Sequence, residues 1–326
     1  MAEEIKIKAS YRPAGGGGKG TLNILNAESG KDVTEWYSDG IKLLAKRAQS
    51  GDKEANKLLA YVIVPPIREV VMYTSWTEIF FSRQTGNLMN PYRFAQDSYS
   101  MIAVATSFGA KPIFVRPSRT TYLNVTPELF ETGLQIQLDQ VAQAGWDIVS
   151  AKIIEAGEEM ARKKDTKART AMVAAVTALG GNYDVDSATF SYASFQSIVK
   201  NSVLGFPVTV AAMNTKRAFD MTDWTLPANS MWMVTQETGE RVLLNQRPTE
   251  GMTLQVLDTQ IRLRNFVPYN EIWFGHAEGQ DWEIEYGTWQ AQDDDVMSQS
   301  RQYAWRENLV HLVRSNYRLR RLEITG

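Results

Sequence analysis

The chain contains no cysteine and only two histidines, His276 and His311, among its 326 residues. The absence of cysteine excludes disulfides, thiolate metal sites and a cysteine nucleophile. Two histidines are too few for an HExxH zinc site or a cage of several histidines around a metal. No stretch approaches the ~18 consecutive apolar residues of a membrane helix, and the opening MAEEIKIKAS lacks the apolar core of a secretory signal. We therefore expect a soluble, cytosolic protein that uses no cofactor and contacts no membrane.

The chain also lacks an excess of charge of either sign. Lys and Arg total 35, Asp and Glu total 37, and the net charge is −2. This balance argues against a protein whose whole surface is built to bind nucleic acid. Hydrophobic residues make up 44 % and charged residues 22 %, which is enough apolar material for an ordered core. The length fits two domains or one elongated subunit with several lobes.

Motifs that carry chemistry are absent as well. Gly18-Lys19 lacks the spacing of a phosphate-binding loop, because Pro13 stands where the first glycine should be and Gly20 follows the lysine. Glu283 and Glu285 lie two apart on a predicted strand, and 293–295 are three aspartates. We interpret both groups as solvated carboxylates and the two histidines as structural. The sequence predicts a protein that is not an enzyme.

The N-terminal third is predicted to contain an extended arm, a broken helix and a projecting loop. The arm covers the first 35 residues and contains four consecutive glycines, 15–18. Apolar residues at steps of three and four predict a helix from Trp36 to Ala60, with a break at 50–52 and an end at Pro65-Pro66.

Residues 67–117 are rich in strand formers and turn residues, which predicts one or two long hairpins. Their aromatic groups either pack within the protomer or contact a neighbouring subunit. The residues we select as inter-subunit contacts are Trp76, Phe80, Phe81, Lys111, Arg116 and Arg119. Arg116 and Arg119 are expected to form inter-subunit ion pairs, with a solvated surface as the alternative.

The middle of the chain predicts a long helix. Thr126-Pro127-Glu128 has the pattern of a helix start, and an apolar stripe then continues to about residue 162. A second, shorter helix is predicted from Asp165 to Leu179, stopped by Gly180-Gly181. A helix of this length suggests a strut rather than an ordinary globular core.

The C-terminal half predicts a mixed α/β region. Expected are a helix at about 190–199, a short strand at 206–210, strands alternating with turns over 230–263, a strand at 272–275 and an extended end from Trp305 to Ile324. Asp293–Asp295 is predicted to be a polar link. Arg314, Arg318 and Arg320 are expected on one solvated or ion-paired strand face. A nucleic-acid contact is the alternative, which no interleaved aromatic residues support.

In this order the elements resemble a tailed-phage major capsid protein of the Hong Kong 97 type. The resemblance rests on the glycine-rich arm, the stretch Val125-Thr126-Pro127-Glu128-Leu129-Phe130-Glu131, the return Phe266-Val267-Pro268-Tyr269-Asn270-Glu271-Ile272-Trp273-Phe274-Gly275, and the terminal strand from Leu309 to Ile324. It implies an α+β fold with an N-terminal arm and helix (1–66), an extended hairpin loop (67–117), a peripheral domain with a spine helix (118–181 and 269–326) and an axial domain (182–268).

The resemblance also implies partners and a location. Hexamers and pentamers of the chain would form the icosahedral head of a tailed bacteriophage around double-stranded DNA, which they would contact weakly. A separate scaffolding protein and a portal are implied, and a decoration protein is a further option. The location would be the virion, after assembly in the host cytoplasm. Lys111 is the only lysine of the loop, so covalent cross-linking is not assumed.

Two alternatives stay open at the level of sequence. One is an encapsulin-like nanocompartment shell, which would hold cargo enzymes and need no portal. The other is an enzyme with an unrecognised site in the axial lobe.

Overall fold

The structure is a computed structural model of the chain. It describes residues 7–12, 21–26, 32–63, 65–86, 93–95, 122–124, 126–201, 207–224, 231–234, 241–242, 253–276, 279, 281–295, 300–314 and 316–325. The glycine-rich stretch 13–20 and most of the predicted loop, 87–92 and 96–121, lie outside these ranges. No helix in the described ranges is long and apolar enough to cross a membrane.

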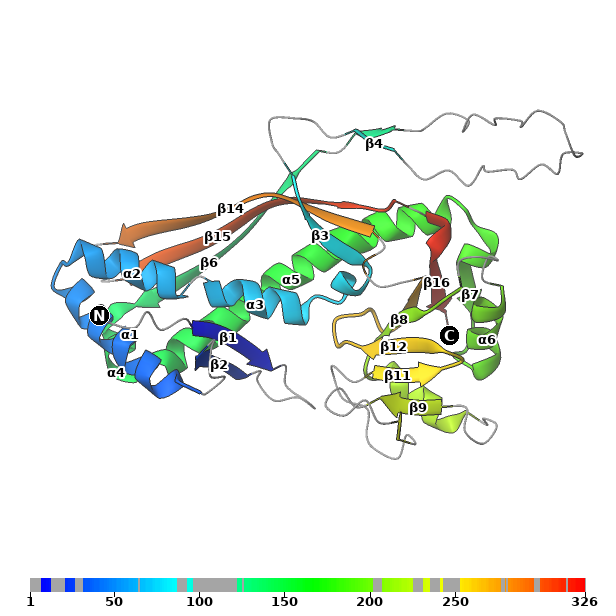
Figure 1. Ribbon diagram of the computed structural model, residues 1–326, viewed down its shortest axis with the longest axis horizontal. Coiled ribbons are helices and arrows are strands. Elements are labelled where there is room, and N and C mark those ends of the chain that lie inside the picture. The colour runs from blue at the N-terminus through cyan, green and yellow to red at the C-terminus, as the bar shows by residue number, and fades with distance from the viewer. Residues whose placement is uncertain are drawn as a thin grey trace, which may run out of the picture.

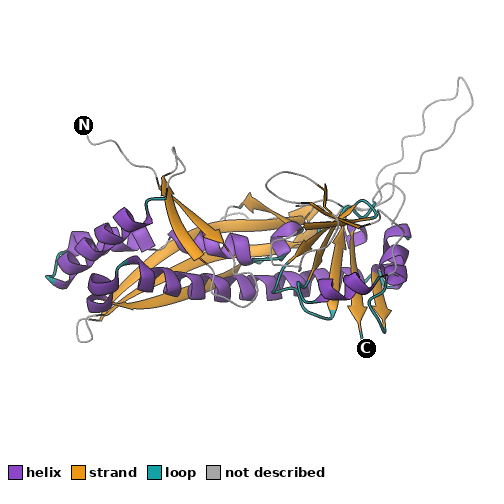
Figure 2. Ribbon diagram, turned by 90° about the horizontal axis from the view of Figure 1, so that it is seen from below, coloured by secondary structure: helices purple, strands orange, loops and turns teal. Residues whose placement is uncertain are grey.

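The described residues form an elongated body in which one long helix runs beside a four-stranded sheet toward an eight-stranded sheet (Figure 1). Seen from below, the helix follows the length of the body (Figure 2). The α-helices of these residues are α1 (Thr34–Gln49), α2 (Lys53–Ile63), α3 (Pro65–Thr74), α4 (Leu138–Ala144), α5 (Trp146–Thr177) and α6 (Tyr192–Lys200). Short 3-10 helices cover Thr77–Ile79, Gly181–Tyr183, Arg217–Asp223 and Asn316–Arg318.

The long helix is α5, with 32 residues and a length of about 48 Å. Its start is set by Gly145, whose φ of 63° favours glycine and where a Cβ would lie 2.5 Å from Ser38 Oγ. It ends before Gly180 and Gly181, which both have positive φ. The predicted stop at these glycines is confirmed, but the helix begins some twenty residues later than predicted and absorbs the separate helix expected from Asp165 to Leu179.

The predicted helix start at 126–128 is wrong, because this segment is a strand, β6 (Glu128–Gln137). Its buried residues Phe130, Leu134 and Ile136 are separated by even steps, which is the strand period of two. All ten residues pair with β15 (Ser300–Leu312). This long-range hydrogen-bonded ladder outweighs the local capping signal of Thr126-Pro127-Glu128.

The predicted strand after Pro66 is also wrong, since residues 65–74 form α3. Proline is tolerated in the first turn of a helix, so Pro65 and Pro66 end α2 and begin α3. Ile67, Val70 and Val71 are buried at helical spacing and face α5. Before them, the predicted helix break at 50–52 is confirmed, with α1 ending at Gln49 and α2 starting at Lys53.

The four-stranded sheet has the order β3-β14-β15-β6. Strand β14 (Asp281–Asp295) pairs antiparallel with β15 and parallel with β3 (Phe81–Thr85), and its register with β15 shifts between Glu285 and Gly287. The three aspartates at 293–295 belong to β14 and not to a polar link, which corrects the prediction.

The eight-stranded sheet has the order β10-β9-β11-β12-β8-β13-β16-β7. The strand-and-turn pattern predicted for 230–263 and the strand predicted at 272–275 are confirmed. Its strands are β7 (Asp184–Ser187), β8 (Val210–Met213), β9 (Met231–Val234), β10 (Arg241–Val242), β11 (Thr253–Val256), β12 (Thr259–Leu263), β13 (Glu271–Gly275) and β16 (Leu319–Ile324).

The predicted C-terminal extended segment is divided between the two sheets. Strand β15 ends at Leu312 in the four-stranded sheet, and β16 pairs with β13 and β7 in the eight-stranded sheet. Arg314, Arg318 and Arg320 therefore do not share a strand face. Arg314 and Arg320 stack over the rings of Trp282 and Tyr183, at 4.0 Å and 4.9 Å from the ring centroids.

Two small ribbons complete the described strands. Strand β1 (Ile7–Arg12) pairs antiparallel with β2 (Thr21–Asn26), and β4 (Arg93–Ala95) pairs antiparallel with β5 (Tyr122–Asn124). The β4–β5 pair brings residues about thirty positions apart together, as a hairpin stem requires.

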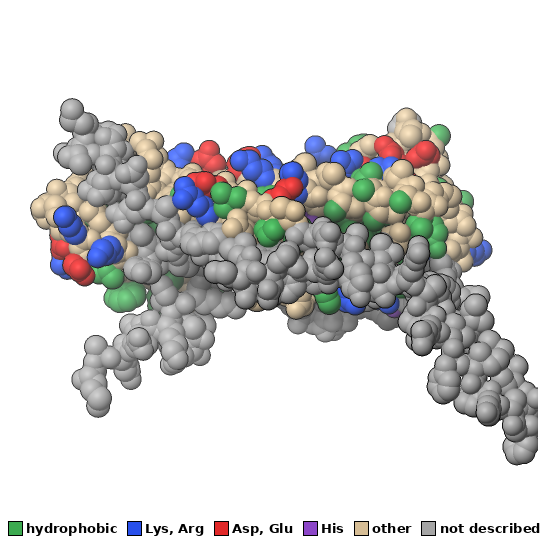
Figure 3. All heavy atoms as spheres, turned by 90° about the horizontal axis from the view of Figure 1, so that it is seen from above, with side chains coloured by type: hydrophobic (Ala, Val, Ile, Leu, Met, Phe, Trp, Pro, Cys, Tyr) green, Lys and Arg blue, Asp and Glu red, His purple; other side chains and the backbone are tan. Residues whose placement is uncertain are grey.

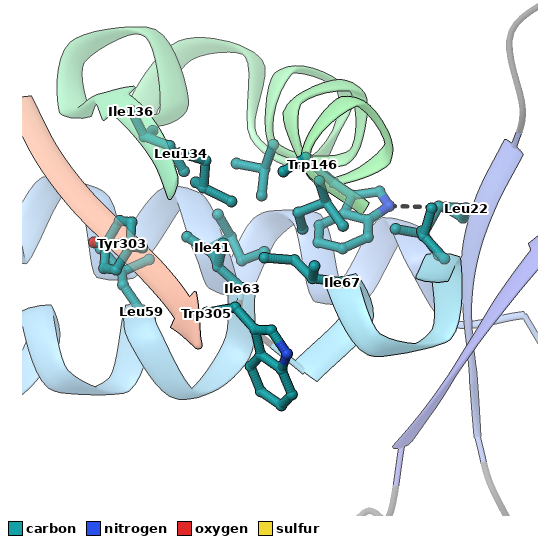
Figure 4. Packing of buried hydrophobic residues seen from close by; sticks show 14 of the residues in the cluster. Leu22, Ile41, Leu59, Ile63, Ile67, Leu134, Ile136, Trp146, Tyr303 and Trp305 are labelled. Carbon is teal, nitrogen blue, oxygen red and sulfur yellow. Dashed lines mark hydrogen bonds between the residues drawn. The ribbon is translucent and has the colours of Figure 1, made fainter. Parts of the chain in front are cut away.

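The core at the α1–α4 end joins segments from both ends of the chain (Figure 4). Trp146 Nε1 donates to the Leu22 carbonyl at 3.1 Å, which fixes β2 on α5. Tyr37 packs edge-on against Trp146 with ring centroids 5.2 Å apart. Tyr303 and Trp305 of β15 belong to the same buried cluster, so the helices and the four-stranded sheet share one core.

Candidate functional site: two buried ion clusters and a surface groove

The first candidate site is a buried cluster of charged side chains centred on Lys164 of α5. The Lys164 side chain is 1 % exposed, and its Nζ lies 3.2 Å from Glu283 Oε1 of β14 and 3.2 Å from Glu307 Oε2 of β15. Glu283 also accepts a hydrogen bond from Arg83 Nε of β3 at 3.1 Å, and its Oε2 lies 3.2 Å from His311 Nε2. The cluster therefore connects the long helix to three strands of the four-stranded sheet.

The pKa values of the cluster follow from burial opposed by neighbouring charge. Burial disfavours the ammonium of Lys164, but Glu283 and Glu307 raise its pKa above the ordinary value. Burial alone would raise the pKa of Glu283, but Lys164 and His311 outweigh it and hold the pKa well below its usual range. Both groups are charged at neutral pH, so the cluster is a set of buried ion pairs.

The neighbouring residue, Asp165, ties α5 to a different element. Its carboxylate accepts hydrogen bonds from Ser75 Oγ at 2.6 Å and Thr77 Oγ1 at 2.7 Å, and from the backbone N–H of Trp76 and Thr77, both at 3.3 Å. Burial raises its pKa, although these donors oppose the shift. Two consecutive helix residues thus anchor α5 to the sheet on one side and to the turn after α3 on the other.

A second buried cluster joins α5 to the eight-stranded sheet. Glu271 of β13 is fully buried and is held by Arg169 of α5, whose Nε donates at 2.8 Å. Arg321 of β16 lies 3.2 Å from Glu271 and donates through Nε to Asp184 at 2.8 Å. Burial opposes the charged carboxylate, but the arginines lower the pKa of Glu271. This cluster fixes the far end of the long helix.

These arrangements fit a structural role better than a catalytic one. The buried carboxylates and ammonium group are neutralised by each other, and no residue of either cluster lines the described groove of about 760 Å³. Among the described residues, no group of three or more His, Asp or Glu side chains is placed to hold a metal ion. The interpretation of Glu283 as a solvated carboxylate was wrong, since it is 4 % exposed.

Sequence reasoning missed Lys164 and Asp165, although a signal for Lys164 exists. The buried stripe of α5 continues at four-residue steps as Met160, Lys164, Ala168, Met172 and Val176. A lysine in an apolar stripe must find buried carboxylates or remain unpaired at a large cost. The stripe predicts that Lys164 is buried, but it does not predict Glu283 and Glu307 as the partners.

The structure corrects half of the predicted inter-subunit contacts. Trp76, Phe80 and Phe81 are 1 %, 0 % and 4 % exposed within a single protomer, so they are core residues rather than a contact surface. For these three residues, packing within the protomer is the interpretation that the structure supports. Lys111, Arg116 and Arg119 lie outside the described residues, and their inter-subunit role remains a prediction.

The second candidate site is the surface groove between β6 and α5. Its lining residues are Glu131, Thr132, Gly133, Leu134, Gln135, Ile136, Gln137, Gln140, Ile148, Lys152, Glu155, Ala156, Glu159 and Lys163. Three glutamates and two lysines are among these residues, so both signs of charge line the groove. On the face of the molecule seen from above, basic and acidic side chains are likewise mixed along the described surface (Figure 3). The groove lining therefore mixes charged, polar and apolar side chains, and neither sign of charge dominates it.

Comparisons with known proteins give no match from sequence and clear matches from structure. No family model and no curated protein matches the chain. The mature capsid subunit of bacteriophage PhiM1 superposes with a TM-score of 0.52 at 10 % identity, covering 78 % of this chain and 88 % of that one. The capsid of an empty GTA particle gives 0.51 at 10 % identity, covering 78 % and 90 %.

The holo-SrpI encapsulin of Synechococcus elongatus PCC 7942 gives a TM-score of 0.48 at 8 % identity, covering 76 % of this chain and 86 % of that one. At these identities the likeness concerns the fold. The two capsid subunits with TM-scores above 0.5 share the overall fold of this chain over 78 % of its length. The chain has the mixed α+β, Hong Kong 97-type fold of capsid proteins.

Proposed function

We propose that the chain is the major shell-forming subunit of an icosahedral particle, and specifically the head of a tailed bacteriophage. The observation that carries the proposal is the match of 78 % of the chain to two capsid subunits with TM-scores above 0.5. A shell subunit needs an elongated, rigid body and large surfaces for neighbours, and it needs no active site. The long helix α5, held to both sheets by buried ion pairs, supports such rigidity.

The proposal includes the division into parts. Residues 1–66 would be the arm with its helices, 67–117 the extended loop, 118–181 with 269–326 the peripheral domain, and 182–268 the axial domain. Hexamers and pentamers of this subunit would surround double-stranded DNA, with a separate scaffolding protein and a portal. Location in the virion, after assembly in the host cytoplasm, belongs to the same proposal.

The test is assembly of the full chain, expressed alone and together with the products of the genes beside it, among which the proposal places a scaffolding protein. Size-exclusion chromatography with light scattering and negative-stain microscopy are expected to detect megadalton shells or stable five- and six-fold rings. A compact monomer under both conditions, turning over a small molecule, would contradict the proposal. Shells that hold protein cargo and no nuclease-protected DNA would favour the nanocompartment alternative.

A further inference from the structure

Helix α1, at the α4 end of the elongated body (Figure 1), presents an apolar stripe to solvent. Its buried side includes Tyr37, Ile41 and Ala45, which belong to the core. On the opposite side Trp36 is 59 % exposed and Leu43 is 61 % exposed, the two highest values among the exposed large hydrophobic side chains of the described residues. The protomer alone therefore leaves an aromatic and an aliphatic side chain of one helix largely in water.

The exposed side of α1 has the spacing of a helix–helix seam. Trp36, Gly40, Leu43 and Arg47 follow one another at steps of four, three and four, and all four are exposed. Residues at alternating steps of three and four lie on one face of a helix and form the seam between two packed helices. The exposed face of α1 thus has the pattern of a surface that packs against another helix.

Gly40 lies in the middle of this seam, and the packing of the protomer does not explain it. Glycine in a helix interior is less favourable than alanine. At Gly40 a Cβ would meet no atom within 4 Å, whereas at Gly157 of α5 a Cβ would lie 2.7 Å from the Val70 side chain. Gly157 is therefore required by a helix inside the protomer, and the open side of Gly40 offers the same close approach to a helix from outside.

The charges of α1 select the direction of such a second helix. Exposed acids lie at and before the N-terminal half of the helix, and exposed bases lie near its C-terminal end: Asp32, Glu35 and Asp39 against Lys46 and Arg47. A parallel copy of α1 would place like charges beside each other. An antiparallel copy places the acidic half beside the basic half, which is electrostatically complementary.

One antiparallel register satisfies the apolar and the charged residues together. Placing Trp36 opposite Leu43 of the second copy also places Asp32 opposite Arg47 of the second copy, because both pairs are centred on the same point, between Asp39 and Gly40. Arg47 contacts Asp52 at 2.6 Å within the protomer, but its side chain remains 56 % exposed and accessible. The face is therefore complementary to itself about a two-fold axis beside Gly40.

We propose that two copies of this chain pair through the exposed faces of α1, antiparallel about a two-fold axis beside Gly40; the inference rests on the proposed function, because an icosahedral shell relates its copies by two-fold axes. Such a contact is isologous, with the same patch on both copies. The 16 residues of α1 are about 24 Å long. One helix pair of this length is smaller than the interfaces of about 1,200 Å² or more that hold stable dimers. We therefore expect pairing in the assembled particle and in concentrated protomer, and not in dilute protomer.

Disulfide cross-linking tests the pairing, because the chain has no cysteine of its own. A single introduced cysteine links only to the same position of a second copy. In the proposed register the two copies of residue 40 are offset by about 1.5 Å along the helix axis, and the two copies of residue 47 by about 22 Å. A disulfide needs Cα atoms about 4.4–6.8 Å apart. Under mild oxidation we expect Gly40→Cys to form covalent dimers at least tenfold faster than Arg47→Cys on the same seam or Glu54→Cys, an exposed position of α2.

A second substitution in the Gly40→Cys chain tests the apolar contact. Leu43→Lys places a charge opposite Trp36 of the second copy and should slow the cross-link at least tenfold. The matched control is Leu179→Lys, which replaces a 41 % exposed leucine beyond the other end of α5 and should leave the cross-link unchanged. Both leucines are exposed, so we expect both variants to fold by circular dichroism.

The outcomes separate this inference from the proposed function. Shells in which Gly40→Cys links no faster than Glu54→Cys would overturn the inference and leave the proposed function standing. Equal linking of Gly40→Cys and Arg47→Cys would overturn the antiparallel register. Protection of Gly40→Cys from a maleimide only after a different protein is added would overturn the second copy as the occupant. Dimers that link as expected, from a chain that forms no ring or shell under any condition, would support the α1 pair and count against the proposed function.

Discussion

At the scale of single residues, the most consequential feature is a lysine inside an apolar helix stripe. Lys164 is as buried as its neighbours in the stripe, and its charge is compatible with that position only because Glu283 and Glu307 lie 3.2 Å away. A buried ion pair of this kind adds little stability compared with a well-packed apolar core. Removing one partner, however, leaves the other as a buried charge without compensation. The cluster therefore enforces one arrangement of α5 on the sheet.

We expect Lys164→Met to destabilise the unassembled protomer by about 3–5 kcal/mol, because it leaves Glu283 and Glu307 without their shared cation. The control is Lys167→Met, one turn further along α5, which removes a surface ion pair with Glu128 at 3.0 Å and should cost at most about 1 kcal/mol. Urea unfolding measures both. Adding Glu307→Gln to Lys164→Met should recover part of the loss. Equal losses for the two lysine variants would show that the cluster does not stabilise the fold.

Glu78, beside the same cluster, predicts a pH dependence. Burial raises its pKa from 4.5 to about 8, although Lys164 opposes the shift. Between about pH 4.5 and 8 the folded chain keeps this proton while the unfolded chain has released it, so the contribution of Glu78 to stability falls as the pH rises through this window. Glu78→Gln should remove that loss.

The measurement is the urea midpoint of wild type and variant at pH 5, 6, 7, 8 and 9. The stability of Glu78→Gln relative to wild type should increase from pH 5 to pH 8 and stay constant above it. Glu54→Gln, at an exposed position of α2, should keep the wild-type pH dependence. Parallel curves for wild type and Glu78→Gln would contradict the prediction.

At the scale of elements, the spacing of apolar residues predicted the type of element only where it fitted a single period, either that of a helix or that of a strand. The break at 50–52 and the stop at Gly180 were predicted correctly, because glycine and turn residues act locally. Segment 128–137 has apolar residues that fit both periods, and the ladder to β15, about 170 residues away in sequence, decided for the strand. For α3, strand-forming residues such as Val70 and Val71 are helical because they face α5.

Two glycines at helical positions predict opposite effects of the same substitution. At Gly157 of α5 a Cβ would lie 2.7 Å from the Val70 side chain of α3, so Gly157→Ala should push the two helices apart and cost about 1–3 kcal/mol. At Gly40 of α1 a Cβ would meet no atom within 4 Å, so Gly40→Ala should stabilise by about 0.5–1 kcal/mol. Thermal or urea unfolding of the protomer gives the sign of each change. Stabilisation by Gly157→Ala would refute the close α3–α5 approach, and destabilisation by Gly40→Ala would refute the open space beside α1.

At the scale of the whole molecule, deletions in the N-terminal segment distinguish residues needed for folding of the protomer from residues needed for assembly. Deletion of residues 1–20 should leave a folded protomer, because the buried Leu22 and Ile24 of β2 remain, and it should impair assembly if the first residues reach a neighbour. Deletion of residues 1–26 is the comparison. It removes both buried side chains and the contact of the Leu22 carbonyl with Trp146, so it should lower the stability of the protomer itself.

Circular dichroism and unfolding curves report the fold, and microscopy reports the assembly. Wild-type shells from the chain lacking residues 1–20 would show that this segment is not a clamp between subunits. Loss of the folded protomer on deletion of residues 1–20 would show that β1 is needed for folding as well as β2.

Sequence alone determined what depends on residue identity and short-range geometry: the lack of thiol and multi-histidine chemistry, the existence of a long helix, the strands over 230–263 and at 272–275, and the general order of elements that resembles a capsid protein. Only the tertiary structure decided that 128–137 is a strand, that Trp76 and Phe80 are core, and that Lys164 meets Glu283 and Glu307. The reason is physical. Helix breaks and hydrophobic periods are set by neighbours along the chain, whereas ladder pairing and buried ion pairs require partners that are distant in sequence and become neighbours only when the chain is folded.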